Sequence, residues 1–186
     1  AVDAELARAA DGATMPAAAR AGTGHAVVAG EGAMDRTTQD LATRLHDALA
    51  LQREAQRRHP MPTLRERKAD LRALKRFVRE HTDALCDAIS ADYGHRSRHE
   101  TMLAEILPVV DGIDSTLRQL AGWMRPQRRS VDRIMFGLAS NRVVPQPLGV
   151  VGVIVPWNFP LNLALLPLTA IFAAGNRALV KMSENS

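Results

Sequence analysis

Four polar side chains near the C-terminal end of the chain could act together on one ligand. Asn158 lies in the turn 156–160, where a proline at each end fixes φ and favours a stiff, extended backbone. Lys181, Ser183 and Glu184 follow further along the chain. A rigid amide, a hydroxyl, an ammonium and a carboxylate predict a site for a polar ligand, provided that the fold brings them to one place.

Two apolar strands and a helix between them are expected to bring these side chains together. The run 150–155 is almost wholly apolar and β-branched, which predicts a strand covered on both faces of a parallel sheet. Residues 161–174 are apolar and end at Gly175-Asn176, which predicts a crossover helix with a left-handed C-cap before a second strand at 178–180. Such a connection is parallel and right-handed, so both strands end at the edge where open α/β sheets bind ligands.

On spacing alone, the same βαβ unit could be purely structural, because a fold does not by itself carry a function. No Gly-x-Gly-x-x-Gly motif follows the first strand; Gly149 and Gly152 lie before and inside it. A dinucleotide would therefore have to bind without the usual glycine turn at a helix N-terminus.

Longer motifs carry a family resemblance. The segment 147–160, PLGVVGVIVPWNFP, with AAGN at 173–176 and VKMSE at 180–184, resembles the cofactor-binding region of the NAD(P)-dependent aldehyde dehydrogenase superfamily. The segment 64–129, with ADYG at 91–94 and Glu105-Ile106, resembles the helical N-terminal part of those proteins. The resemblance implies oxidation of an aldehyde to a carboxylic acid with NAD, the aldehyde being aromatic (coniferyl aldehyde, for example) or of medium chain length.

The resemblance also implies roles for matched residues. Asn158 would donate its side-chain amide to the aldehyde oxygen, as half of an oxyanion hole. Lys181 and Glu184 would hold the adenosine ribose, and Glu184 would repel a 2′-phosphate, which favours NAD while leaving NADP possible. The remaining cofactor-binding candidates are Ile154, Val155, Pro156, Trp157 and Ser183.

The family's chemistry also needs a nucleophilic cysteine and a water-activating glutamate, and neither matches a position here. Cys86 is the single cysteine and lies inside a periodic apolar helix pattern, which is typical of an inert structural thiol. We therefore expect an N-terminal portion of an enzyme that is inactive alone. One cysteine excludes a disulfide framework and fits a reducing cytoplasm.

The expected fold class is α/β and aldehyde-dehydrogenase-like: a helical N-terminal part followed by the first βαβ unit of a Rossmann-like nucleotide-binding sheet. We divide the chain into a disordered tail (1–40), a helical part of the cofactor-binding domain (41–129), an oligomerisation-arm segment (130–146) and the start of the NAD-binding sheet (147–186). The resemblance implies a homodimer or homotetramer.

Within the helical part, three helices are expected. The first begins near Leu41 and ends before Pro60. Thr63 with Glu66 forms a capping box that starts the second, which runs towards Asp92. The third carries an apolar face over 99–124 and is kinked by Pro108, because proline cannot complete the helical hydrogen bonding.

A net charge of +4 and a pI of about 10.0 raise an alternative, a basic nucleic-acid-binding or other partner-binding fragment. Against nucleic acid, the arginines alternate with acidic residues and no aromatic side chains interleave them. We expect no nucleic acid and no membrane partner. The six histidines, among them His95 and His99 beside Glu100, lack a matching ligand set, so no metal is expected.

Overall fold

The computed structural model describes residues 36–184. Two compact units divide after Asp47, and helix α2 (Arg36–Arg58) spans the boundary. Most of the predicted tail, residues 1–35, lies outside the described residues, whereas 36–40 form the start of α2. The second unit contains the strands and helices that position the predicted site residues.

Helix α3 (Leu64–Glu80) begins as predicted. Thr63 is its N-cap: its hydroxyl accepts from the Glu66 amide at 3.3 Å, and the Glu66 carboxylate accepts from the Thr63 amide at 2.7 Å, so the capping box is confirmed. The expectation of one helix running to Asp92 is wrong, because α3 ends at Glu80 and α4 (Thr82–Asp92) follows. The break is at His81, whose torsions (φ −106°, ψ 13°) leave the helical range although its amide still donates to the Phe77 carbonyl at 3.0 Å.

The third predicted helix is continuous but irregular. It comprises α5 (Arg98–Thr101), the π-helical turn η1 (Met102–Ile106) and α6 (Leu107–Trp123). Pro108 has no amide to give the Ala104 carbonyl, and that carbonyl accepts instead from the Asn162 side chain at 2.9 Å. The irregularity expected at Pro108 therefore takes the form of a wider turn just before it.

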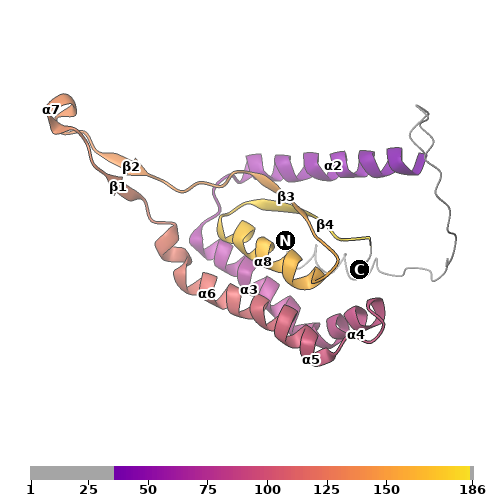
Figure 1. Ribbon diagram of the computed structural model, residues 1–186. Coiled ribbons are helices and arrows are strands. Elements are labelled where there is room, and N and C mark those ends of the chain that lie inside the picture. Colours follow the sequence, from indigo (N-terminus) through magenta and orange to yellow (C-terminus); the bar gives the residue numbers. More distant parts are fainter. Residues whose placement is uncertain (1–35, 185–186) are drawn as a thin grey trace, which may run out of the picture. The chain divides into compact units, whose positions relative to one another are not determined.

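An arm follows α6. Strands β1 (Gln127–Arg129) and β2 (Asn141–Val143) pair antiparallel, with α7 (Arg133–Phe136) at the tip of the ribbon (Figure 1). Asp132 caps α7 by accepting from the amides of Ile134 and Met135. The ribbon begins at Gln127, three residues before the predicted arm segment, and its tip exposes large apolar side chains: Ile134, Met135, Phe136 and Leu138.

The βαβ unit is confirmed. Strands β3 (Val150–Ile154) and β4 (Arg177–Lys181) are parallel and are joined by α8 (Pro160–Ala173), and Gly175 has the left-handed φ of 80° expected of the C-cap. The prediction that the first strand is covered on both faces is wrong for the described residues. Val155 is buried, but Ile154 is 82% exposed, because within residues 36–184 the sheet has two strands and α8 lies on one side of it (Figure 1).

Helix α8 is the central element of the core. It packs against α3, α6 and both strands of the pair. The approach to α6 is close at Gly112, where a Cβ atom would lie 2.7 Å from a Leu166 methyl carbon. Fully buried side chains include Leu71, Leu74, Val78, Val109, Ile113 and Leu120. Among the described helices, none combines the length and the hydropathy that crossing a membrane requires.

Candidate functional site

The carboxyl ends of β3 and β4 lie side by side, as the sequence predicted. Ile154 pairs with Lys181, and the Val155 amide donates to the Lys181 carbonyl at 2.9 Å. Beyond this pair, the chain enters the turn that carries Asn158, which is exposed. The side chain with the proposed chemistry therefore lies at the ligand-binding edge of the strand pair.

A guanidinium from the loop between α4 and α5 holds this turn. Arg96 Nη1 donates to the Asn158 carbonyl at 3.2 Å and to Glu105 Oε1 at 3.0 Å. The same group lies over two aromatic rings, 4.7 Å from the centre of Phe159 and 5.2 Å from that of Tyr93. The main chain at Asn158 is thereby tied to a loop 62 residues earlier in the sequence.

Glu105 joins this contact to the start of α8. Its carboxylate is fully buried, and Oε2 accepts from the amides of Leu161 at 2.8 Å and Asn162 at 3.2 Å. Amides in the first turn of a helix lack intrahelical partners, and a negative charge there complements the helix dipole. Arg96 pairs the charge, so the buried carboxylate is both hydrogen-bonded and neutralised.

Neither partner of this pair was given a role in the site from the sequence, although Glu105 belongs to one of the motifs that carry the family resemblance. A signal was present, since Glu105 occupies the same i, i+4, i+8 row as Val109 and Ile113, which are both fully buried. A charged residue on an apolar row indicates a buried, partnered carboxylate. No comparable pattern singles out Arg96, which lies in a loop.

Buried polar atoms without a hydrogen bond gather around the same pair. Within the described part of the chain, these side-chain atoms are Tyr93 Oη, Thr101 Oγ1, Asn162 Oδ1 and Arg96 Nε, the last of which lies 3.4 Å from Glu100 Oε1 in an ion pair. Burial also raises the pKa of the Tyr93 hydroxyl. Such atoms are rare in folded proteins, so their concentration behind the Asn158 turn marks a specialised region.

The proposed ribose-binding residues are brought together at the end of β4. Lys181 Nζ donates to Glu184 Oε1 at 2.7 Å, and this bond lowers the pKa of Glu184. Both side chains are largely exposed, and Ser183 between them is half-buried. A paired ammonium and carboxylate at an open edge can offer a donor and an acceptor to a polyhydroxylated ligand.

The predicted cofactor path is only partly accessible. Ile154, Pro156 and Trp157 are exposed at the edge. The Val155 side chain is 3% exposed and belongs to the core, and its amide is bonded to Lys181.

Cys86 lies elsewhere, buried in α4 at 2% exposure. Burial raises the pKa of its thiol, which disfavours the reactive thiolate. This environment supports the structural interpretation of Cys86. The described residues contain no group of three or more His, Cys, Asp or Glu side chains arranged to hold a metal ion.

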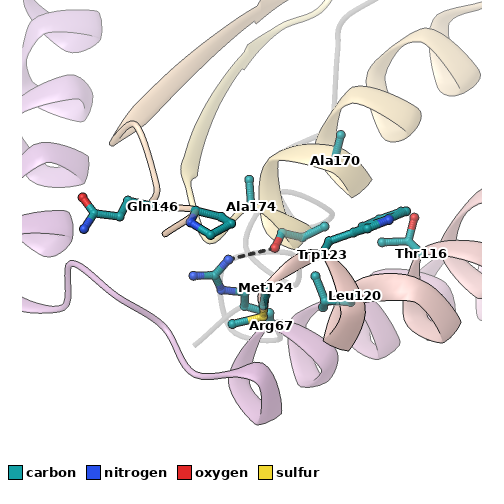
Figure 2. Close-up of a pocket in the computed structure, with 10 residues that line it drawn as sticks. Arg67, Thr116, Leu120, Trp123, Met124, Gln146, Ala170 and Ala174 are labelled. Atoms are coloured by element: carbon teal, nitrogen blue, oxygen red, sulfur yellow. Dashed lines mark hydrogen bonds between the residues drawn. The ribbon is translucent and has the colours of Figure 1, made fainter. Parts of the chain in front are cut away.

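A largely apolar pocket lies at the opposite end of α8. Its volume is about 380 Å³, and Figure 2 shows Trp123, Leu120 and Arg67 around it. Arg67 donates to the carbonyls of Ala173 at 3.0 Å and Pro62 at 2.9 Å, the former drawn as a dashed line. Because no predicted site residue lines this pocket, we place the candidate site at the Asn158 edge.

Comparisons with known proteins agree with the sequence resemblance. The model of the aldehyde dehydrogenase family matches residues 29–186. A probable coniferyl aldehyde dehydrogenase of Pseudomonas aeruginosa is 46% identical over 149 residues, covering 80% of this chain and 31% of the relative. A coniferyl aldehyde dehydrogenase of a Pseudomonas species is 50% identical over 105 residues, covering 56% of this chain and 21% of the relative.

Comparison with a solved structure also indicates an aldehyde dehydrogenase fold. The NAD-dependent benzaldehyde dehydrogenase of Corynebacterium glutamicum superposes with a TM-score of 0.61 at 25% identity, covering 72% of this chain and 28% of that structure. The chain thus spans about a third or less of the length of the relatives that it matches.

Proposed function

This chain belongs to the aldehyde dehydrogenase family, and from that premise we propose that it supplies the oxyanion donor and part of the cofactor site of an aldehyde-oxidising enzyme. The observation that carries the proposal is the placement of Asn158, exposed at the edge where β3 and β4 end and tied at its main chain by Arg96. We use "full-length enzyme" for a polypeptide that carries this segment together with the remaining length of its relatives.

The amide of Asn158 suits an aldehyde substrate. Negative charge develops on the carbonyl oxygen only when a nucleophile adds to the carbon, so a neutral donor fixed in advance stabilises the transition state more than the ground state. One such donor is typically worth roughly 3–4 kcal/mol. Cys86 is buried with a raised pKa, so the attacking thiolate has to come from another part of the full-length enzyme.

Lys181 and Glu184 support a nicotinamide cofactor at the same edge. Bound there, the cofactor would accept the hydride that leaves the aldehyde carbon. The exposed carboxylate of Glu184 would accept hydrogen bonds from ribose hydroxyls and repel a 2′-phosphate, which favours NAD over NADP. Solved structures of similar fold do not decide between the two cofactors, because they include an NAD-dependent benzaldehyde dehydrogenase and a glyceraldehyde-3-phosphate dehydrogenase complexed with NADP.

We further propose an aromatic aldehyde as substrate. The support is the identity of 46% and 50% to two coniferyl aldehyde dehydrogenases. For assembly we propose a homodimer or homotetramer, since the arm exposes Ile134, Met135, Phe136 and Leu138, at 96%, 75%, 64% and 104%. The single, buried cysteine is compatible with a reducing compartment such as the cytoplasm.

The experiment that tests the central proposal is Asn158→Ala in the full-length enzyme. We expect kcat/KM for coniferyl aldehyde to fall roughly a hundredfold or more, with NAD affinity nearly unchanged, because the lost donor acts in the transition state. Asn141→Ala is the matched control, since this exposed amide bonds to Ser130 within the arm and should leave kcat/KM as it is. Weakened NAD binding with normal turnover would make Asn158 a cofactor-shaping residue instead.

A further inference from the structure

The contacts behind the Asn158 turn involve two residues to which the proposed function assigns no part in the reaction, Arg96 and Glu105. The guanidinium of Arg96 contacts the Asn158 carbonyl and one oxygen of Glu105. The other oxygen of Glu105 binds the amides of Leu161 and Asn162. One buried ion pair thus contacts the main chain on both sides of the junction between the turn and α8.

We propose that Glu105 and Arg96 are positioning residues that hold Asn158 in the orientation in which its amide donates to the aldehyde oxygen. The proposal rests on the proposed function of Asn158 and supplies a cause for its geometry. An oxyanion donor is effective only when it is fixed before the reaction, to within a fraction of an ångström. The prolines fix φ at 156 and 160 and restrict residues 155 and 159 before them, but they leave the torsions of Trp157 and Asn158 free, so the contact at the Asn158 carbonyl adds the missing restraint.

The way in which α8 is capped argues against a purely structural role. Helices α3 and α7 are capped locally, by Thr63 and Asp132. The N-cap residue of α8, Phe159, makes no side-chain hydrogen bond, and the first-turn amides bind a carboxylate 56 residues away in sequence. A buried ion pair is a costly substitute for a serine or aspartate cap, because both charges lose their hydration. The long-range pair accomplishes what a local cap cannot, since it connects the helix to the turn.

The test begins with Glu105→Gln in the full-length enzyme. We expect kcat for coniferyl aldehyde to fall roughly tenfold to a hundredfold while the Kd for NAD changes by less than about twofold, as for a change felt at the transition state. Asp114→Asn is the matched control. Asp114 also forms an ion pair, with Lys75 at 2.6 Å, but this pair joins α6 to α3. It should leave kcat unchanged.

A double mutant separates positioning from general stability. If Glu105 acts through Asn158, adding Glu105→Gln to Asn158→Ala should cause no further loss of kcat, because no donor remains to be positioned. If the double mutant instead lost kcat by the product of the two single-mutant factors, the proposal would be overturned. A normal kcat in the Glu105→Gln enzyme would overturn it as well. A normal kcat in the Asn158→Ala enzyme would instead overturn the proposed function, so the two failures are distinguishable.

Arg96→Lys tests the same proposal if the Glu105→Gln enzyme does not fold. Lysine retains a positive charge beside Glu105 but lacks the planar group that lies over Phe159. We expect a folded enzyme whose kcat is several-fold lower and whose loss again disappears in the Asn158→Ala background. A folded Arg96→Lys enzyme with unchanged kcat would contradict the positioning role.

Discussion

The two ends of helix α8 are held in the same way but serve different purposes. Each end binds a buried charged side chain from another helical segment, Glu105 at the N-terminus and Arg67 at the C-terminus. The signs match the helix dipole, which favours an anion at the first turn and a cation at the last. The crossover helix is therefore anchored electrostatically at both ends.

The difference lies in what else each charge contacts. Glu105 is paired with Arg96, and this pair reaches the turn that carries Asn158. Arg67 donates to two main-chain carbonyls, and burial lowers its pKa. The N-terminal end of α8 is thus coupled to the proposed chemistry, whereas the C-terminal end fixes the approach to β4. Variants at or beyond the C-terminal end of α8 should change the free energy of unfolding or cofactor binding without changing kcat. Variants at its N-terminal end should lower kcat.

The largest effect is expected for Gly175→Ala. A Cβ there would lie 2.6 Å from Arg67 Cζ, and the guanidinium cannot withdraw without leaving the Ala173 carbonyl. The left-handed φ adds about 1–2 kcal/mol, so we expect a loss of about 3 kcal/mol or more in the free energy of unfolding. Urea denaturation would measure it.

Gly94→Ala is the matched control for Gly175→Ala. Gly94 also has a positive φ, 60°, but its added Cβ would meet nothing within 4 Å. Only the backbone cost should remain there, about 1–2 kcal/mol. Equal losses at the two glycines would show that the Arg67 contact does not determine this end of the helix.

A smaller effect, confined to cofactor choice, is expected for Glu184→Gln in the full-length enzyme. Removing the carboxylate removes its repulsion of a 2′-phosphate, and because the side chain is 83% exposed the preference for NAD should narrow only roughly threefold to tenfold. The change should come from better NADP binding, while kcat stays constant. Steady-state KM values for both cofactors would show it, with Glu80→Gln as an exposed control on α3. An unchanged ratio would mean that Glu184 does not face the ribose.

Thr63→Ala tests a local cap against the long-range caps of α8. The loss of an N-cap hydroxyl should lower the free energy of unfolding by about 1 kcal/mol without changing kcat. The effect should depend on pH, since hydrogen bonds from Thr63 lower the pKa of Glu66 from 4.5 to about 2. A depressed carboxyl pKa contributes stability above its unfolded value, which is lost as the pH falls through the folded one.

The difference in free energy of unfolding between wild type and Thr63→Ala should therefore reach its maximum above pH 4.5 and become smaller as the pH approaches 2. Thermal unfolding of both proteins across this range would measure it. A difference that stays constant with pH would mean that Glu66 does not take part in the cap.

The smallest effect on activity is expected for Cys86→Ser. The thiol is buried in α4 with a raised pKa, so the full-length enzyme should keep its kcat within about twofold. Loss of most activity would contradict the structural role of Cys86. Slow reaction of the native thiol with a water-soluble disulfide reagent would support it.

Much of the fold could be predicted from the sequence because its signals are local. The capping box at Thr63 and the left-handed turn at Gly175 each depend on residues within one turn of each other. The parallel pairing of β3 and β4 follows from chirality once a helix separates two apolar strands, and it brings Asn158 and Lys181 to one edge. The family resemblance was carried by contiguous motifs and is confirmed by the match to residues 29–186.

The tertiary structure alone decided how the site is held. Glu105 contacts amides 56 and 57 residues away, and Arg96 contacts a carbonyl 62 residues away. No periodicity or spacing encodes such a meeting, since it depends on how α8 packs against η1 and α6. The exposure of Ile154 was equally hidden, because an apolar strand has the same sequence whether one of its faces is covered or both are. The sequence thus determined which residues could do chemistry, and packing determined which distant side chains keep them in place.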